Sequence, residues 1–161
     1  MVRPVHHILV YLDGSEESII ASQYAVVLAR ALDAQLHGIY VVNTRALQDL
    51  VKAHIFLDSE QDEYQRDLAS DAGRYLSHLE LIAQRKGVTV QSHTCSGTVH
   101  QEILNCIKEQ HIDLLVLGEL SRIRSRKDEF YNEPERAMRL APCSVLIAKD
   151  EEYISELYDA L

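Results

Sequence analysis

The sequence predicts a doubly wound α/β fold, with five parallel strands and helices on both faces of the sheet. Five short apolar runs alternate with amphipathic segments along the chain, which is typical of successive β-α-β units. The run from Asp113 to Leu117 is almost continuously apolar, as expected of a strand that is buried on both faces. Gly118 ends this run at the edge where parallel sheets bind their ligands.

Size and charge restrict the classes of function. The chain has 161 residues, which suits one domain with one core, and its formal net charge of -9 repels nucleic acid and anionic lipid. We therefore expect no nucleic-acid partner. No run reaches the ~18 apolar residues that span a bilayer, and nothing after Met1 is typical of a signal peptide, so we expect a cytoplasmic protein without a membrane partner.

The first predicted strand covers Ile8–Leu12 and ends at an Asp-Gly-Ser turn. Ser15 is a plausible N-cap for a helix over Glu16–Leu32. Two acids open that helix and complement its dipole, which makes its N-terminus a poor phosphate site. The second strand is predicted over Gln35–Val42. The segment Asn43–Leu57 is either a short amphipathic lid over the strand ends or a surface connection, and we favour the connection.

A long one-faced helix is predicted over Glu60–Lys86, with Gly87 as its C′ residue and a third strand over Val88–Thr94. Thr98 and Gln101 have the spacing of a capping box. The helix that they open is expected to bury three apolar side chains, those of Ile103, Leu104 and Ile107.

The last predicted helix of the main domain begins near Asn132, with Asn132 and Glu135 as capping residues and Pro134 in the first turn, and it ends at Pro142. The fifth strand is predicted over Cys143–Ala148. We divide the chain into a domain over residues 1–149 and an acidic tail over 150–161. Three tail residues repeat at helical spacing and predict a further helix that packs on its own chain or on a partner: Tyr153, Leu157 and Leu161.

No metal site and no catalytic group are predicted. His6 and His7 are adjacent and point to opposite faces of a strand, and His37 and His54 are expected at the surface or rim. His93 and His100 flank a turn near Cys95, but no spacing matches a structural zinc site. The chain has three cysteines and no CxxC spacing, so we expect no disulfide; Cys106 and Cys143 are interpreted as small core residues. Asp13 and Ser15 are the nearest approach to a nucleophile with its base, and capping explains them better.

Three blocks of sequence together resemble one family. The family is that of the universal stress proteins of the UspA type, known from bacteria and archaea. Ile8–Ser15 resembles its opening strand with the D-G-S turn. Asp113–Gly118 resembles its D-L-I-V-M-G block, and Ala141–Ile147 resembles its A-P-C-P-V-L-V ending. The resemblance covers about Val5 to Lys149. It implies strand order 3-2-1-4-5, the sheet of the adenine-nucleotide alpha-hydrolase-like proteins, and a homodimer through the last strand (Val145, Leu146 and Ile147). From its amphipathic pattern we expect the tail to take part in that dimer. An apolar edge strand is normally covered, which supports that expectation.

Many members of this family bind ATP through a G-x2-G-x9-G-S/T loop after the fourth strand. Here the second glycine falls on Ser121, the third on Tyr131 and the final serine on Asn132, while Gly118 keeps the first place. A large side chain at Tyr131 stands where the backbone of the family approaches phosphate. A basic stretch fills the loop instead, with Arg122, Arg124, Arg126 and Lys127. It is either a solvated loop or an anion-binding one.

Eight positions are candidate nucleotide contacts, Arg122 and Arg124 among them because arginine can replace lost backbone donors to phosphate: Asp13, Val41, Leu117, Gly118, Ser121, Arg122, Arg124 and Asn132. Asp13 matches the family's acid near adenine and ribose, although it is explained equally well as a residue that caps a turn. Val41 matches the family's apolar adenine contact, although it is explained equally well as a core residue. We expect a non-catalytic stress-response module that acts as a homodimer, with a degenerate nucleotide loop and unidentified protein partners. The alternative is a protein that binds ATP or AMP with little or slow hydrolysis, its phosphates held by residues 122–127. A third interpretation keeps the cleft for another small anion.

Overall fold

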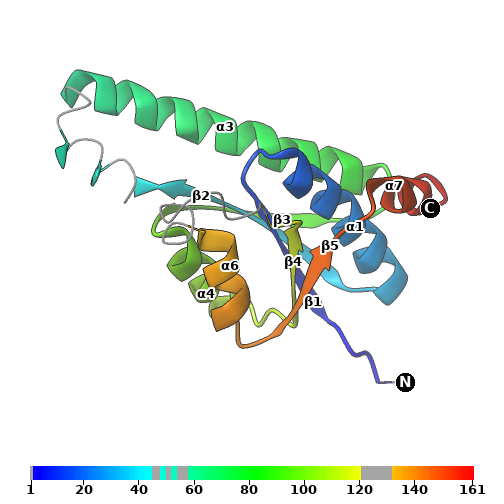
Figure 1. Cartoon of the computed structure of the whole chain (residues 1–161). Helices are drawn as coiled ribbons and strands as arrows, with labels where there is room; N and C mark the ends of the chain where they lie inside the picture. Colours follow the sequence, from blue (N-terminus) through cyan, green and yellow to red (C-terminus); the bar gives the residue numbers. More distant parts are fainter. Residues whose placement is uncertain (1, 45–47, 50–51, 54–57, 121–131) are drawn as a thin grey trace.

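Figure 1 shows the computed structural model of the chain, which describes residues 2–44, 48–49, 52–53, 58–120 and 132–161. Its strands are β1 (His7–Leu12), β2 (Gln35–Asn43), β3 (Val90–Gly97), β4 (Leu114–Gly118) and β5 (Ser144–Ala148). Its helices are α1 (Glu16–Leu32), α3 (Asp58–Gln84), α4 (Val99–Glu109), α6 (Glu133–Leu140) and α7 (Glu151–Asp159). The predicted alternation of strands and helices is confirmed, and α1 has the bounds that the sequence predicted.

The five strands form one parallel sheet in the order β3-β2-β1-β4-β5, as the resemblance implied. β1 lies at its centre, where Ile8 pairs with Leu36 of β2 and with Leu114 of β4. Asp113 fixes the start of this pairing, because its Oδ2 accepts hydrogen bonds from the backbone N–H groups of His6 (2.6 Å) and His7 (2.8 Å). In the described part of the chain, β5 pairs only with β4.

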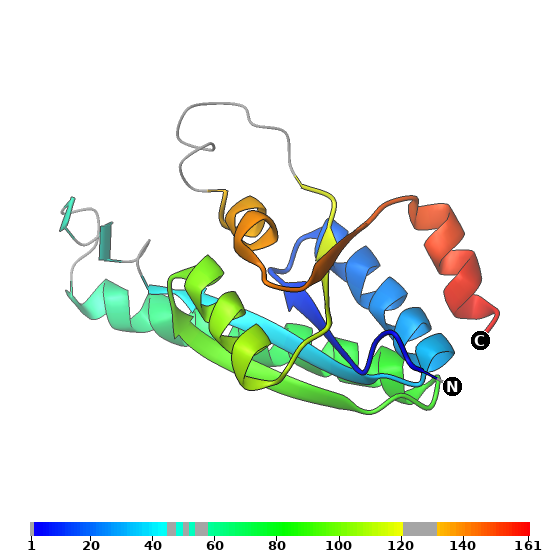
Figure 2. The same ribbon diagram turned by 90° about the horizontal axis from the view of Figure 1, so that it is seen from below.

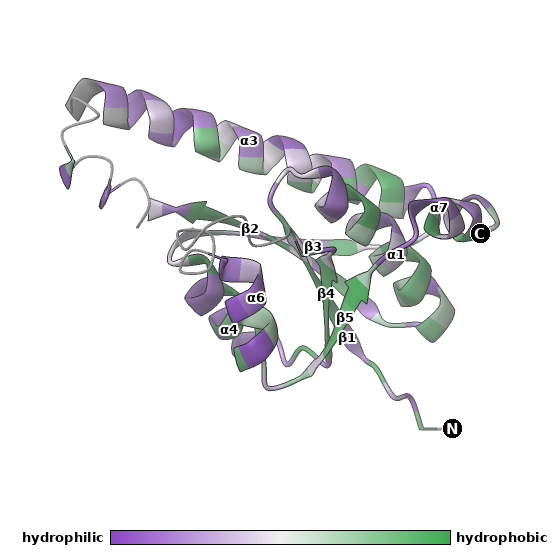
Figure 3. Ribbon diagram, viewed as in Figure 1, coloured by the Kyte–Doolittle hydropathy of each residue, from purple (hydrophilic) through white to green (hydrophobic). Residues whose placement is uncertain are grey.

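Side chains alternate between two cores, one on each face of the sheet. Along β1, Ile8, Val10 and Leu12 face α1 and α3, whereas Leu9 and Tyr11 face α4 and α6. Figure 2 shows α4 and α6 on the face opposite α1. In Figure 3 the strands β1, β2, β4 and β5 are mainly hydrophobic, while the outer part of α3, which projects past the ends of the strands, is mainly hydrophilic.

Two helix starts follow the prediction and a third does not. The Ser15 hydroxyl accepts from the Ser18 N–H at 3.2 Å, and the Asn132 amide oxygen accepts from the Glu135 N–H at 3.2 Å. The predicted capping box at Thr98 is wrong, because the Thr98 side chain makes no capping hydrogen bond. Glu133, which is distant in sequence, takes its place: its carboxylate accepts from the His100 N–H at 2.8 Å.

The C-terminal helix α7 packs against its own chain, beside α1 in Figure 2. Its buried stripe differs in part from the predicted one. Ile154 and Tyr158 are buried, and Leu157 packs against the core as predicted, while Tyr153 is 53% and Leu161 37% exposed. The Tyr158 hydroxyl donates to the Ile82 carbonyl at 2.7 Å. In a continuing helix the Lys86 N–H would donate to the Ile82 carbonyl, but here it donates to the Ala83 carbonyl. The Tyr158 hydroxyl therefore satisfies the Ile82 carbonyl at the end of α3.

Candidate functional site

The predicted nucleotide contacts gather at the carboxyl edge of the sheet, as expected of parallel strands. Asp13 follows β1, Val41 lies near the end of β2, and Leu117 and Gly118 end β4. Asn132 caps α6, which lies on the same side of the sheet as the side chains of Val41 and Leu117. The remaining predicted contacts, Ser121, Arg122 and Arg124, lie outside the described residues, as does most of the predicted lid or connection.

Each described candidate already has a role within the fold. The Asp13 carboxylate accepts hydrogen bonds from the backbone N–H and the hydroxyl of Ser15, which closes the turn before α1. Val41 and Leu117 belong to the core between the sheet and α4, with 6% and 1% of their surface exposed. The Asn132 amide oxygen is occupied by the Glu135 N–H.

The turn between Asp13 and Ser15 also packs against α3. Gly14 has a φ of +83°, and a Cβ at this position would lie 2.6 Å from the ring of Tyr75. Tyr75 in turn stacks on Tyr40, with ring centroids 6.0 Å apart. The backbone of this turn is therefore set by close packing and by a positive φ that favours glycine.

Gly118 is required by the approach of α1. A Cβ added to Gly118 would lie 2.5 Å from the carbonyl carbon and oxygen of Glu17. The contacting atoms are backbone atoms, which cannot move aside as a flexible side chain would. The glycine that the sequence marks most clearly thus lets the first turn of α1 pack on the end of β4.

A buried polar cluster around Glu133 lies near Tyr11, and no pattern in the sequence indicated it. Glu133 is 8% exposed, and its Oε2 accepts from both the backbone N–H and the Nδ1–H of His100, at 2.8 and 2.6 Å. Arg136 lies 3.7 Å from the other carboxylate oxygen. Burial raises the pKa of the nearby Tyr11 phenol well above its ordinary value, and Asp13, Tyr40 and Glu133 add to the effect. Tyr11 therefore stays a neutral hydroxyl at physiological pH.

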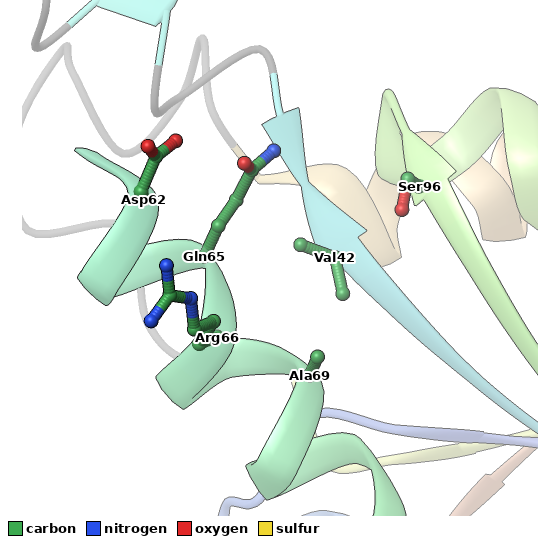
Figure 4. Close-up of a pocket in the computed structure, with 6 residues that line it drawn as sticks. All are labelled: Val42, Asp62, Gln65, Arg66, Ala69 and Ser96. Atoms are coloured by element: carbon green, nitrogen blue, oxygen red, sulfur yellow. The ribbon is translucent and has the colours of Figure 1, made fainter. Parts of the chain in front are cut away.

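Two hollows open near this edge, and their linings differ in charge. The first, of about 360 Å³, lies between α3 and the ends of β2 and β3 and is lined by Val42, Asp62, Gln65, Arg66, Ala69 and Ser96 (Figure 4). Val42 faces α3, so this hollow is on the side of the sheet opposite Val41 and Leu117. Its volume lies at the lower end of the range for small-molecule sites.

The second hollow, of about 230 Å³, lies where α1 and α7 begin. Its lining combines one lysine with five acids: Glu16, Glu17, Glu119, Asp150 and Glu151. The potential of such a lining disfavours a phosphate, as the sequence predicted for the start of α1.

The histidines are arranged differently from the prediction. His37 was expected at the surface or rim, but it is 1% exposed, and its ring contacts those of His7 and His93. His54 lies outside the described residues. His93 and His100 bond to His37 and Glu133 respectively. Among the residues that the structure describes, no group of three or more His, Cys, Asp or Glu side chains is arranged to hold a metal ion. All three cysteines are free, and of the two interpreted as core residues Cys106 is buried and Cys143 half-buried.

The sheet order and the position of these residues define an α/β protein with a nucleotide-binding-type fold. Residues 4–149 match the model of the universal stress protein family. The chain belongs to the universal stress protein family. In the part of the chain that the structure describes, no helix is long and apolar enough to cross a membrane.

Two relatives carry the family name. The chain is 26% identical over 144 residues to universal stress protein MJ0531 of Methanocaldococcus jannaschii, covering 88% of this chain and 81% of that protein. It is 28% identical over 148 residues to universal stress protein YxiE of Bacillus subtilis, covering 88% and 97%.

Solved structures share the fold. Universal stress protein UspA from Lactobacillus plantarum superposes with a TM-score of 0.70 at 23% identity, covering 90% of this chain and 98% of that one. A universal stress protein from Archaeoglobus fulgidus, solved in complex with dAMP, gives a TM-score of 0.62 at 14% identity, covering 90% and 98%. A universal stress protein solved in complex with cAMP gives 0.58 at 21% identity, covering 90% and 97%.

Proposed function

We propose that this universal stress protein is a non-catalytic stress-response module that acts as a homodimer and carries a degenerate nucleotide loop. The observation that carries the proposal is that residues of the candidate site are already engaged in contacts within the chain. The Asp13 carboxylate closes its own turn, and the space beside Gly118 is filled by the backbone of α1. The sequence adds Ser121 and Tyr131 at two glycine positions of the family's phosphate loop. These features favour a fold that keeps the family's architecture without its phosphate cradle.

The dimer is proposed to form at the free edge of β5. Val145, Leu146 and Ile147 are half-buried there, and a strand edge of this kind offers unpaired backbone groups that proteins normally cover. The apolar face of α7 is occupied within its own chain, so β5 is favoured over the tail as the main contact.

Replacing Ile147 with lysine is expected to convert a micromolar dimer into a monomer, because a charge on an edge strand opposes pairing with a second edge. Light scattering after size exclusion measures the mass, and thermal unfolding checks that the variant still folds. Leu81→Lys is the matched control, since Leu81 is 46% exposed on α3, away from β5. A wild-type protein that is monomeric at micromolar concentration would contradict the proposed dimer.

The second candidate function is the binding of an adenine nucleotide. It is supported by the related structures with dAMP and cAMP and by the place of Asp13 at the carboxyl edge of the sheet. The phosphates would be held by the basic residues 122–127, since arginine can grip a phosphate through two hydrogen bonds.

Calorimetric titration with Mg-ATP separates the two functions, after any co-purified nucleotide has been removed. Under our proposal we expect no binding heat up to millimolar ATP and no thermal stabilisation. Saturable binding of one ATP per chain would favour the second function instead. In that case Arg122→Gln and Arg124→Gln should weaken binding more than Lys127→Gln, because lysine offers phosphate a point charge without the planar fork.

A further inference from the structure

Three histidines form a continuous hydrogen-bonded row across the sheet. His7 is on β1, His37 on β2 and His93 on β3, which are neighbouring strands. The His7 Nδ1 lies 3.3 Å from the His37 Nε2, and the His37 Nδ1 lies 3.1 Å from the His93 Nε2. The rings of His37 and His93 are stacked at 14°, with centroids 5.4 Å apart. We call these three residues the histidine row.

The row lies on the face of the sheet that α4 covers. Each histidine is two residues from a strand residue that packs in the core beneath α4 and α6: Leu9, Ile39 and Cys95 respectively. The row therefore crosses the half of the sheet that lies beneath α4, below the level of the candidate nucleotide residues. His37, at its centre, is 1% exposed, and the two outer rings are half-buried.

Few charges surround the row. Burial lowers the pKa of His37 to about 4, and His93 and His7 add to this. Burial also lowers the pKa of His93, although Glu109 of α4 opposes the effect. At the other end, Asp113 accepts the backbone N–H of His7 and lies 3.9 Å from the ring of His6. Acidic groups thus lie beyond both ends, and among the described residues the hydrogen-bond partners of His37 are the rings of His7 and His93.

Counting protons shows what such a row can accept. Each bridge between two rings holds one hydrogen, and each of the two outward nitrogens can hold one more. Both bridges are therefore satisfied by three neutral rings, and equally by three rings with one additional proton, which can sit on any of them. A second additional proton places two hydrogens in one bridge and breaks it. A broken bridge would leave a buried donor without an acceptor, at a cost to the packing beneath α4.

We propose that His7, His37 and His93 form a proton-accepting relay, which shares one proton with its hydrogen bonds intact and loosens the α4 face of the sheet when acid supplies a second. Protons enter and leave through the outward nitrogens of the half-buried outer rings. The relay makes the stability of this face a function of pH and is independent of whether the chain binds a nucleotide.

The direction of the pH dependence follows from the lowered pKa of His37. Its ordinary value is 6.5, and its value in the folded chain is about 4. Between these two values the unfolded chain binds a proton that the folded chain does not. Stability is therefore full above about pH 6.5 and falls as the pH drops towards 4, by up to about tenfold per pH unit in the folding equilibrium constant for each such histidine.

The protonation of each ring can be read directly by ring ¹H–¹⁵N correlation spectra of ¹⁵N-labelled wild-type protein, recorded from pH 8 to pH 4. We expect the ring signals of His37 and His93 to change together, because hydrogen-bonded rings titrate as a coupled pair, and we expect His37 to become protonated only near pH 4. His78, which is exposed on α3, serves in the same spectra as a comparison histidine outside the row. Unrelated midpoints for His37 and His93, or a His37 that titrates near pH 6.5, would overturn the proposal.

Stability measurements provide the second test. Urea unfolding from pH 8 to pH 4 is compared for the wild type, His37→Gln, His93→Gln and the control His78→Gln. Between pH 6.5 and pH 4 the folding equilibrium constant of the wild type should fall. For both row variants we expect that fall to be smaller by a factor of at least about ten. The control should follow the wild-type profile. If His37→Gln does not fold, His93→Gln decides the question, because its residue is only half-buried; a profile as steep as that of the wild type would refute the relay.

Discussion

Replacing Gly118 with alanine is expected to lower the free energy of unfolding by about 3 kcal/mol, at the upper end of what overpacking costs. The added Cβ would lie 2.5 Å from the carbonyl group of Glu17, far inside van der Waals contact. To relieve the clash, the first turn of α1 must move away from β4, which disturbs the cap at Ser15 and the turn at Asp13. Urea unfolding monitored by circular dichroism measures the loss.

Gly73→Ala is the matched control for this prediction. Gly73 lies inside α3, and a Cβ there would meet nothing within 4 Å. Alanine is the better helix former, so this variant should gain about 0.5–1 kcal/mol. Opposite signs for the two variants would show that sterics govern Gly118. An unchanged stability for Gly118→Ala would mean that α1 does not press on this glycine, and its space would then be open to a ligand.

Replacing Glu133 with alanine is the second large effect, an expected loss of about 2 kcal/mol, as is typical when hydrogen bonds to a charged group are removed. The carboxylate accepts the N–H and the Nδ1–H of His100 and joins the starts of α4 and α6. Its removal leaves the first turn of α4 uncapped, because Thr98 does not cap it. Glu133→Gln keeps an oxygen acceptor and should lose less.

Glu135→Ala controls for the loss of an acid from the same helix. Glu135 pairs with Arg139 at 2.7 Å on the surface of α6, and such pairs contribute about 0.3–0.5 kcal/mol. Chemical denaturation of the three variants under one buffer gives the comparison. If Glu133→Ala and Glu135→Ala cost the same, the capping role assigned to Glu133 is wrong.

Short-range patterns predicted the elements well. α1 runs over the residues that the sequence indicated, because Ser15 caps it and its apolar positions recur at helical spacing. α6 begins at Glu133 for the same kind of reason, since Asn132 caps it as predicted. The prediction failed where a distant partner replaced a local one. The cap of α4 comes from Glu133, a residue 33 positions away from His100, and no pattern within the helix indicates it.

The histidines illustrate the same limit. Considered without its neighbours, His37 has a polar side chain and is predicted at the surface or rim. Its burial becomes favourable only because β1 and β3 bring His7 and His93 to its two nitrogens, which satisfies both of them. Alternation along three strands could have suggested that the rings share a face, but their register could not be read from one sequence.

The sequence by itself determined the class of fold, the order of elements and the caps whose partners lie within a few residues, because these depend on periodicity and local hydrogen bonding. It also marked Asp13 and Gly118 at the carboxyl edge of the sheet. Only the tertiary structure decided what these residues touch: a serine hydroxyl for Asp13 and the backbone of α1 for Gly118. It likewise decided that α7 buries Ile154 and Tyr158, because burial depends on which surface a helix meets and not on its own pattern alone.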